Sequence, residues 1–238
     1  NCEKILVREN SAKKYLLAAN CSKKKILVAG DPAFGIDFKV QKNVNLLSQK
    51  KINYVGVCLR TEYWKIKNKP DQFFKKHAEI LSKFSIKHNV RLMFIPNCFY
   101  SSSHWEDDRV VHKNIIKGLS KNVKFINFTK KNNIFENLNL ISKCCFLITN
   151  RRHSFVFASL NNISGMIYDI GFKGHLQPLV TELGIRTNLI NFTEPKSIIL
   201  RHLDKLYYER SLNVKKVSKK INNLKKIARS HYKVLTGN

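Results

Sequence analysis

The chain has 238 residues, of which 43% are hydrophobic, and it includes 15 Phe and 8 Tyr. This composition is typical of a globular protein with a buried core and excludes a disordered chain. The longest apolar runs are far too short to span a membrane, and no signal peptide opens the sequence. The first residue is Asn1 and the only methionines are Met93 and Met166, so we expect upstream residues to be absent.

The formal net charge of +28 comes from 44 Lys and Arg against 16 Asp and Glu. Such an excess suits nucleic acid or an anionic membrane surface as a partner. Most of the basic residues are Lys, and they are spread over the whole chain apart from a concentration between residues 215 and 233. We therefore interpret the charge mainly as a bias of composition, which disfavours nucleic acid and leaves peripheral membrane contact open.

The 6 cysteines form no Cys-x-x-Cys pair, and most lie within apolar runs. This pattern predicts free, buried thiols in a reducing compartment, hence a cytoplasmic protein, with association at the inner face of a membrane left open. Cys2 and Cys21 would pair only in a secreted chain. No spacing of Cys and His fits a zinc site, so no metal is expected.

The first 38 residues contain two short apolar strands, at 4–8 and 25–29, with a helix at 12–19 between them. Ser11 is the expected N-cap of that helix, and Gly30-Asp31-Pro32 ends the second strand. We interpret residues 1–38 as the end of an N-terminal Rossmann-like lobe. The polar stretch 39–51 is the predicted connector to a second domain.

Apolar strands and amphipathic helices alternate from residue 52 onward, which predicts a parallel sheet with helices on both faces. Residues 52–195 form this expected Rossmann-like domain, and 196–238 form a basic helical segment. The apolar stripe of that segment favours packing on its own domain over binding to a membrane surface. The predicted strands cover 52–59, 90–95, 123–128, 144–149, 165–168 and 187–192, and the predicted helices cover 70–87, 110–119, 133–142, 154–160, 176–183 and 196 to the end.

The chain is organised around the apolar strand 144–149 and the polar residues that follow it, Arg151, Arg152 and His153. In open parallel sheets, ligands bind at the carboxyl ends of the strands, and the N-terminus of a helix attracts anions. The cluster therefore predicts a site for a small anion, such as a phosphate or a carboxylate. The alternative is that both arginines are solvated loop residues and that His153 only caps the helix.

Several blocks, in this order, resemble the polysaccharide pyruvyl transferase family. They are LVRENSAKKYLLAANC with GDPAF, then VGVCLR, WEDD, ISKCCFLITNRRHSFVFASLNNISGMIYD, and Lys173-Gly174 with LVTELGI. The long block carries the family's Arg-x-His after a strand, an alanine in the helix and a final Tyr, matched here by Arg151, His153, Ala158 and Tyr168. Ser164 stands where the family usually has Pro, and two extra residues separate Tyr168 from the lysine. The resemblance covers only the second part of a family member.

The resemblance implies a GT-B-like protein of two Rossmann-like lobes that moves a pyruvyl group from phosphoenolpyruvate to a sugar hydroxyl. It also implies that Arg60, Arg151, Tyr168 and Lys173 bind substrates, and Arg152 of the same polar cluster is a further candidate. His153 is expected to be the general acid that protonates the donor's C3 atom, or else a cation that holds the phosphate. The implied partners are phosphoenolpyruvate and a saccharide or lipid-linked saccharide acceptor, with no further cofactor.

Two other functions stay open on sequence grounds. In a nucleotide-sugar glycosyltransferase of the same build, the Arg and His cluster would hold a diphosphate, and Glu182 is the nearby candidate for a ribose contact. A non-catalytic basic module would bind nucleic acid or a membrane instead, but most of the aromatic residues lie on apolar stripes and not on a basic face.

Overall fold

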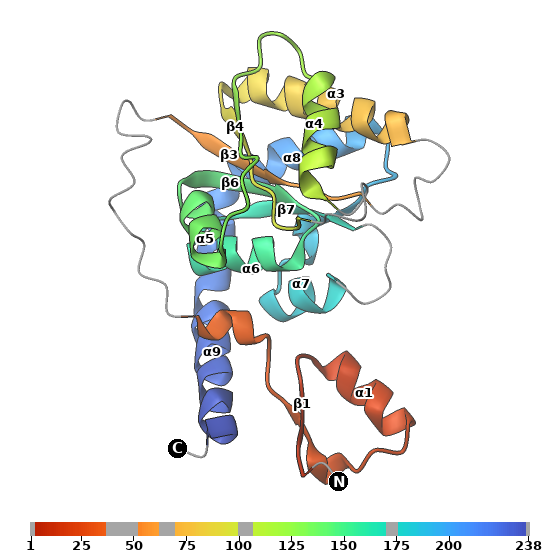
Figure 1. Ribbon diagram of the computed structural model, residues 1–238, viewed down its shortest axis with the longest axis vertical. Coiled ribbons are helices and arrows are strands. Elements are labelled where there is room, and N and C mark those ends of the chain that lie inside the picture. The colour runs from red at the N-terminus through yellow and green to blue at the C-terminus, as the bar shows by residue number, and fades with distance from the viewer. Residues whose placement is uncertain (1–2, 37–51, 62–69, 100–106, 170–175, 237–238) are drawn as a thin grey trace.

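The computed structural model describes residues 3–36, 52–61, 70–99, 107–169 and 176–236, with side chains up to residue 229 (Figure 1). The described strands form two separate parallel sheets, one of two strands and one of six. The predicted connector 39–51 lies outside the described residues.

The small sheet pairs β1 (Ile5–Val7) with β2 (Ile26–Val28), and α1 (Asn10–Ala18) and the 3-10 helix η1 (Lys23–Lys25) connect them. Both predicted strands and the helix are therefore confirmed. The predicted N-cap is wrong, because the helix begins one residue before Ser11 and Glu9 takes the N-cap position without a side-chain cap bond.

The large sheet has the strand order β5-β4-β3-β6-β7-β8, and every neighbouring pair is parallel. Counted within this sheet, the order is 3-2-1-4-5-6, which is that of a dinucleotide-binding Rossmann fold. The strands are β3 (Tyr54–Cys58), β4 (Arg91–Phe94), β5 (Phe125–Asn127), β6 (Cys144–Thr149), β7 (Gly165–Asp169) and β8 (Leu189–Asn191). The predicted α/β class with a parallel sheet is confirmed.

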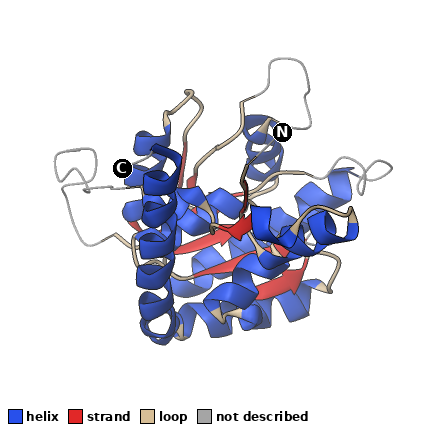
Figure 2. Ribbon diagram, turned by 90° about the horizontal axis from the view of Figure 1, so that it is seen from below, coloured by secondary structure: helices blue, strands red, loops and turns tan. Residues whose placement is uncertain are grey.

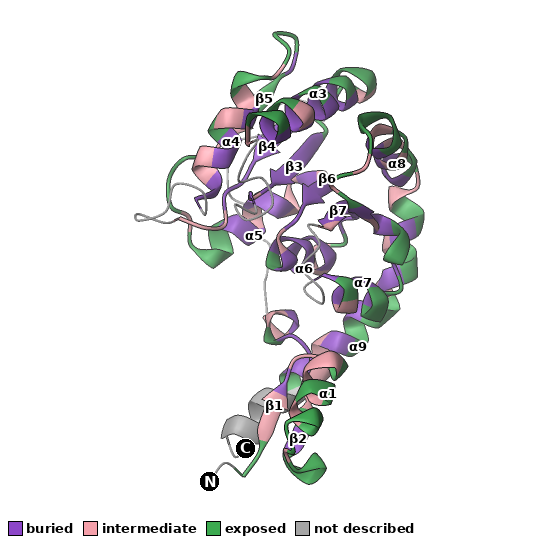
Figure 3. Cartoon of the chain, turned by 90° about the vertical axis from the view of Figure 1, so that its right-hand side faces the viewer, coloured by how far each residue is buried: buried purple, intermediate pink, exposed green. Residues whose placement is uncertain are grey.

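Helices cover both faces of the large sheet, as Figure 2 shows. One face packs against α3 (Pro70–His88), α4 (Asp108–Lys117) and α8 (Lys196–Tyr208), and the other against α5 (Ile134–Ser142), α6 (Arg152–Leu160) and α7 (Gln177–Leu183). The four inner strands, β3, β4, β6 and β7, are buried on both sides, which explains their continuous apolar runs. Figure 3 shows this buried centre between exposed outer helix faces.

Local signals in the sequence set several helix ends. Asn133 and Glu136 form a capping box at the start of α5. Gly184 ends α7 in the left-handed conformation with φ 70°. The last strand is shorter than predicted, because Arg186–Asn188 form a 3-10 helix before β8.

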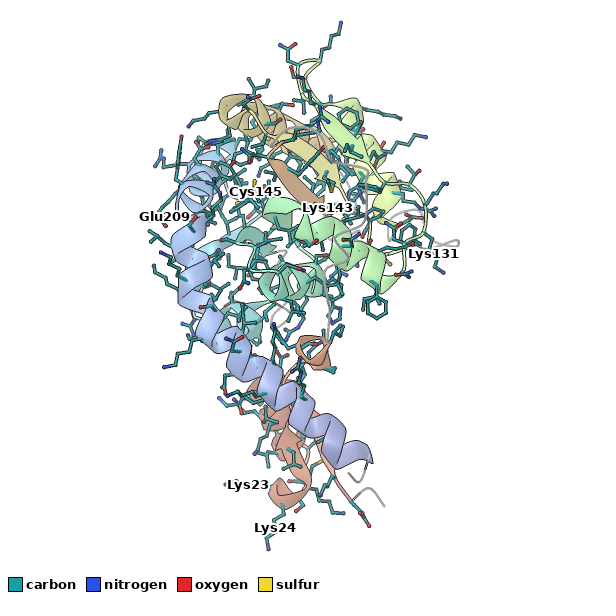
Figure 4. All side chains as sticks on the ribbon, turned by 90° about the vertical axis from the view of Figure 1, so that its left-hand side faces the viewer. Lys23, Lys24, Lys131, Lys143, Cys145 and Glu209 are labelled. Carbon is teal, nitrogen blue, oxygen red and sulfur yellow. The ribbon has the colours of Figure 1, made fainter. Side chains whose placement is uncertain are left out.

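The last helix, α9 (Arg210–Thr236), contacts both the large domain and the segment that follows the small sheet. It packs on α6, on α7 and on the 3-10 helix η2 (Pro32–Gly35), which follows β2. Its buried stripe shares one core cluster with Phe34, and that stripe consists of Val217, Ile221, Leu224 and Ala228. Figure 4 shows α9 running from Glu209 along the domain to the N-terminal segment that carries Lys23 and Lys24. The predicted packing of the helix on its own chain is confirmed.

Within the described part of the chain, none of the helices is both long enough and apolar enough to cross a membrane. The five described cysteines are free thiols, and Cys58 and Cys144 are buried. Cys2, for which a bridge to Cys21 was considered, lies outside the described residues.

Candidate functional site

The centre of the large sheet is its switch point, where β3 and β6 lie side by side and the strand order reverses. Cys58 pairs with Thr149 at the carboxyl ends of these strands. Arg60 and Arg151 each lie two residues beyond that pair, at the same edge of the sheet. This edge is where open α/β sheets bind their ligands. Arg60 and Arg151, which the resemblance implies bind substrate, therefore lie at one edge of the sheet.

Side-chain hydrogen bonds connect the ends of the two strands at this edge. Thr149 donates through Oγ1 to the carbonyl of Cys58 at 2.8 Å, and the same oxygen accepts from the backbone N–H of Arg151 at 2.9 Å. Asn150 accepts from the backbone N–H of Arg60 at 2.9 Å and donates to the carbonyl of Arg60 at 2.8 Å. The backbone that carries both arginines is thus held by hydrogen bonds between β3 and β6.

Arg151 forms an ion pair with Asp108, the first residue of α4. The Asp108 side chain is fully buried, whereas that of Arg151 is 17% exposed. The second oxygen of the same carboxylate accepts from the backbone N–H groups of Asn97 at 2.9 Å and Cys98 at 3.1 Å. Two amides therefore orient the carboxylate, and the carboxylate holds a terminal nitrogen of Arg151.

A buried polar network supports this edge from the loop after β4. Asn97 donates to the Ser154 hydroxyl at 2.8 Å and accepts from the Asn137 amide at 3.1 Å, so it joins α6 to α5. His112 of α4 accepts from the backbone N–H of Leu59 at 3.3 Å. Burial lowers the pKa of His112 to about 4, which keeps the ring neutral and able to accept this bond.

Arg152 occupies a different environment from Arg151, although the two are adjacent in the sequence. Its guanidinium Nε lies 3.0 Å from the carboxylate of Asp31, and its Nη1 lies 3.3 Å from that of Glu9. Its side chain is 2% exposed. Its charge is matched by two carboxylates of the N-terminal segment, so it ties that segment to the start of α6. Its assignment to substrate binding stays a prediction.

His153 is the most accessible member of the Arg-x-His motif, with 58% of its side chain exposed. Its Nε2 lies 3.8 Å from the carboxylate of Asp31, and its ring stacks on Phe157 with a centroid distance of 6.4 Å. Partial burial lowers the pKa of the imidazole, Asp31 opposes this shift, and Arg8 and Arg152 reinforce it. The ring therefore borders the switch-point edge and remains accessible for proton transfer.

The structure does not bring Tyr168 to this edge. The side chain is 1% exposed in the core between the sheet and α3, with its ring 5.1 Å from that of His77. Burial raises the pKa of the phenol, so it stays protonated. Tyr168 therefore packs in the core, and its assignment to substrate binding stays a prediction. Lys173 lies outside the described residues.

Glu182, considered as a ribose contact, lies on α7 close to the ion pairs of the N-terminal segment. Partial desolvation raises the pKa of its carboxyl, Arg152 opposes the rise, and the carboxylates of Glu9 and Asp31 add to it. These influences connect it to the Arg152 cluster and not to the switch point.

Four residues that contribute to the site were not among the site residues expected from the sequence. Asp108 and Asp31 did lie in blocks that resemble the family, so a signal was available for both. Asn150 directly precedes the arginines and Glu9 follows the first strand, but neither stands out in the sequence. Their partners are separated from them by many residues, and only the folded chain brings them together.

Solved structures with the same fold include UDP-GlcNAc 2-epimerases and a glycosyltransferase. UDP-GlcNAc 2-epimerase from Neisseria meningitidis, bound to UDP-GlcNAc, superposes with a TM-score of 0.66 at 12% identity, over 99% of this chain and 62% of that chain. The Methanocaldococcus jannaschii UDP-GlcNAc 2-epimerase in complex with UDP-GlcNAc and UDP has a TM-score of 0.60 at 13% identity, over 99% and 61%. The glycosyltransferase of kitacinnamycin has a TM-score of 0.52 at 12% identity, over 96% and 51%.

The fold and the position of the site thus define a GT-B-like protein. This chain spans less than two thirds of the length of these solved structures. A family model described as polysaccharide pyruvyl transferase matches residues 1–169. The chain belongs to that family. None of the curated proteins matches the sequence.

Proposed function

We propose that the protein is a pyruvyl transferase that forms a pyruvate ketal on a saccharide, with phosphoenolpyruvate as the donor. The observation that carries the proposal is the placement of Arg60 and Arg151 together at the switch point of a chain that belongs to this family. The donor carries a carboxylate and a phosphate, and guanidinium groups bind such anions through charge-assisted hydrogen bonds.

In the proposed reaction, His153 donates a proton to C3 of the donor, so that C2 becomes an oxocarbenium-like electrophile. One sugar hydroxyl adds to C2, and a second hydroxyl replaces the phosphate at the same carbon. Of the two protons that the hydroxyls lose, one balances the proton taken up at C3 and the other leaves with inorganic phosphate. The accessible imidazole beside the arginines supports this role. The scheme uses no cofactor beyond the donor.

The acceptor that we propose is a saccharide or a lipid-linked saccharide, handled in the cytoplasm with peripheral contact to a membrane. The charge of α9 supports such contact, because its 27 residues include no acidic side chain. The helix's apolar stripe is already packed inside the protein, so attraction would be electrostatic. Binding to anionic vesicles that disappears at high salt, with none to neutral vesicles, is the expected result. Binding to random DNA at physiological salt would favour a nucleic-acid module instead.

The test of the donor is a binding and turnover experiment with the full-length protein. We expect phosphoenolpyruvate to raise the melting temperature more than UDP-GlcNAc or UDP does. Release of inorganic phosphate from phosphoenolpyruvate should depend on a saccharide acceptor. Stabilisation by the nucleotide sugars alone would refute the pyruvyl donor and favour a nucleotide-sugar glycosyltransferase.

A further inference from the structure

Asn150 makes two hydrogen bonds to a single residue, Arg60, that lies two positions beyond the end of the neighbouring strand β3. Its side-chain oxygen accepts from the backbone N–H of Arg60 at 2.9 Å, and its side-chain nitrogen donates to the backbone carbonyl of Arg60 at 2.8 Å. Asn150 is 1% exposed. The backbone pairing of β3 with β6 ends at Cys58 and Thr149, so this amide acts as a strand partner for Arg60 beyond the end of the ladder.

We propose that Asn150 is a positioning residue that sets the direction in which Arg60 leaves the sheet. The proposal rests on the proposed function for the identity of the anion that Arg60 binds. Because one amide satisfies both backbone groups of Arg60, the peptide units on either side of this residue are fixed relative to β6. The start of the Arg60 side chain is thereby fixed relative to Arg151, whose own backbone N–H is held by Thr149.

The chemistry of this contact requires a primary amide. An aspartate at position 150 would accept from the N–H of Arg60 but would place a carboxylate oxygen against the carbonyl of Arg60. An alanine would leave the backbone N–H and carbonyl of Arg60 without this partner, which costs free energy. The side chain of Arg151 has a different partner, the carboxylate of Asp108.

The test is a double-mutant cycle for phosphoenolpyruvate affinity in the full-length protein, with Asn150→Ala and Arg60→Ala separately and together. A residue that acts through Arg60 loses its effect when Arg60 is absent. We expect Asn150→Ala alone to weaken donor binding by about tenfold, and by less than about twofold in the Arg60→Ala background. Equal weakening in both backgrounds would overturn the proposal.

Asn188, the last residue of the 3-10 helix before β8, provides a matched control beside the same sheet. It is also an asparagine that is 1% exposed, and its side-chain nitrogen donates to the carbonyl of Gly165 at 2.7 Å. Gly165 begins β7, so this contact lies at the amino edge, away from the arginines. Asn188→Ala should lower the melting temperature without changing donor affinity. A change in donor affinity equal to that of Asn150→Ala would show a general effect of stability and overturn the positioning role.

A measurement without ligand separates this proposal from the proposed function. Hydrogen exchange of the Arg60 amide should become faster in Asn150→Ala and stay unchanged in Asn188→Ala. If the wild-type protein fails to bind phosphoenolpyruvate, the proposed donor is refuted while the exchange result still decides the role of Asn150. Unchanged protection of the Arg60 amide in Asn150→Ala would overturn the positioning role, whatever anion the site binds.

Discussion

Arg152 and Asp31 are 121 positions apart in the sequence, yet the Nε of the arginine lies 3.0 Å from a carboxylate oxygen of the aspartate. Both side chains are only 2% exposed. The contact joins the turn after β2 to the first residue of α6. Because Arg151 and His153 flank Arg152, this ion pair anchors the N-terminal segment directly beside the candidate site.

Replacing Arg152 should therefore affect stability more than donor binding. Arg152→Gln leaves the buried carboxylate of Asp31 without its main partner, and breaking a buried ion pair costs about 3–5 kcal/mol. We expect a loss of this size in the free energy of unfolding, measured with urea. The affinity for phosphoenolpyruvate should change little in the fraction that stays folded.

The double variant Asp31→Asn/Arg152→Gln serves as the control, because it removes both charges of the pair. It should recover part of the lost stability. A large loss of donor affinity in Arg152→Gln with unchanged stability would instead assign Arg152 to the substrate.

His153 and Arg151 should give different kinetic signatures. Loss of a general acid in His153→Gln should lower kcat by roughly 10²–10⁴-fold and leave phosphoenolpyruvate affinity nearly intact. Arg151→Ala removes a charge-assisted contact, so it should chiefly weaken donor binding. Separate measurement of turnover and donor affinity distinguishes the two. Unchanged turnover in His153→Gln would make this histidine a structural residue.

The pH dependence of kcat/KM should report the imidazole of His153 in the free protein. Burial lowers the pKa of His153, and the Asp31 carboxylate partly counteracts this. Since the proposed reaction needs the imidazolium, kcat/KM should be high at low pH and fall as the pH rises through this pKa. In Asp31→Asn, the carboxylate that favours the imidazolium is gone, so the fall should occur at lower pH. A fall at unchanged or higher pH would contradict the role of Asp31.

Acid should destabilise the protein through His112. Burial lowers the pKa of His112 from 6.5 to about 4, so the unfolded chain binds a proton that the folded chain does not between these values. Stability is therefore lost as the pH falls from 6.5 towards 4, by about 3 kcal/mol from this residue. His112→Gln keeps an acceptor for the N–H of Leu59 but has no titrating ring. Urea unfolding should show a slope with pH that is smaller by about 1 kcal/mol per pH unit, and an unchanged slope would refute this assignment.

The packing of α9 offers a test with two leucines on the same helix. Leu224 is 4% exposed and belongs to the core cluster that contains Phe34, whereas Leu212 is 58% exposed. Leu224→Ala should lower the free energy of unfolding by about 2–5 kcal/mol. Leu212→Ala should change it by less than about 0.5 kcal/mol. Similar effects of the two substitutions would contradict the burial of the stripe on α9.

Local patterns in the sequence were sufficient to predict the strands and helices of the large domain and the edge of the sheet that carries the candidate site. Strands buried on both faces are continuous apolar runs, and helices on a sheet carry an apolar stripe, so both are visible in a single sequence. Caps such as Asn133 and Gly184 depend on residues a few positions away, so the signal for them is local in the sequence. The shared edge of Arg60 and Arg151 followed from the direction of parallel strands.

Only the tertiary structure decided what each polar residue of the cluster does. Arg151 and Arg152 are neighbours in the sequence, but their first partners are Asp108 of α4 and Asp31 of the N-terminal segment. Tyr168 matched a family position and is nevertheless enclosed in the core. Ion pairs and hydrogen bonds over long separations depend on which elements pack together, and that packing is set by the core as a whole. The sequence by itself therefore determined the sheet, its helices and the edge at which we predict an anion site, whereas the contacts of the folded chain decided which side chains face that edge.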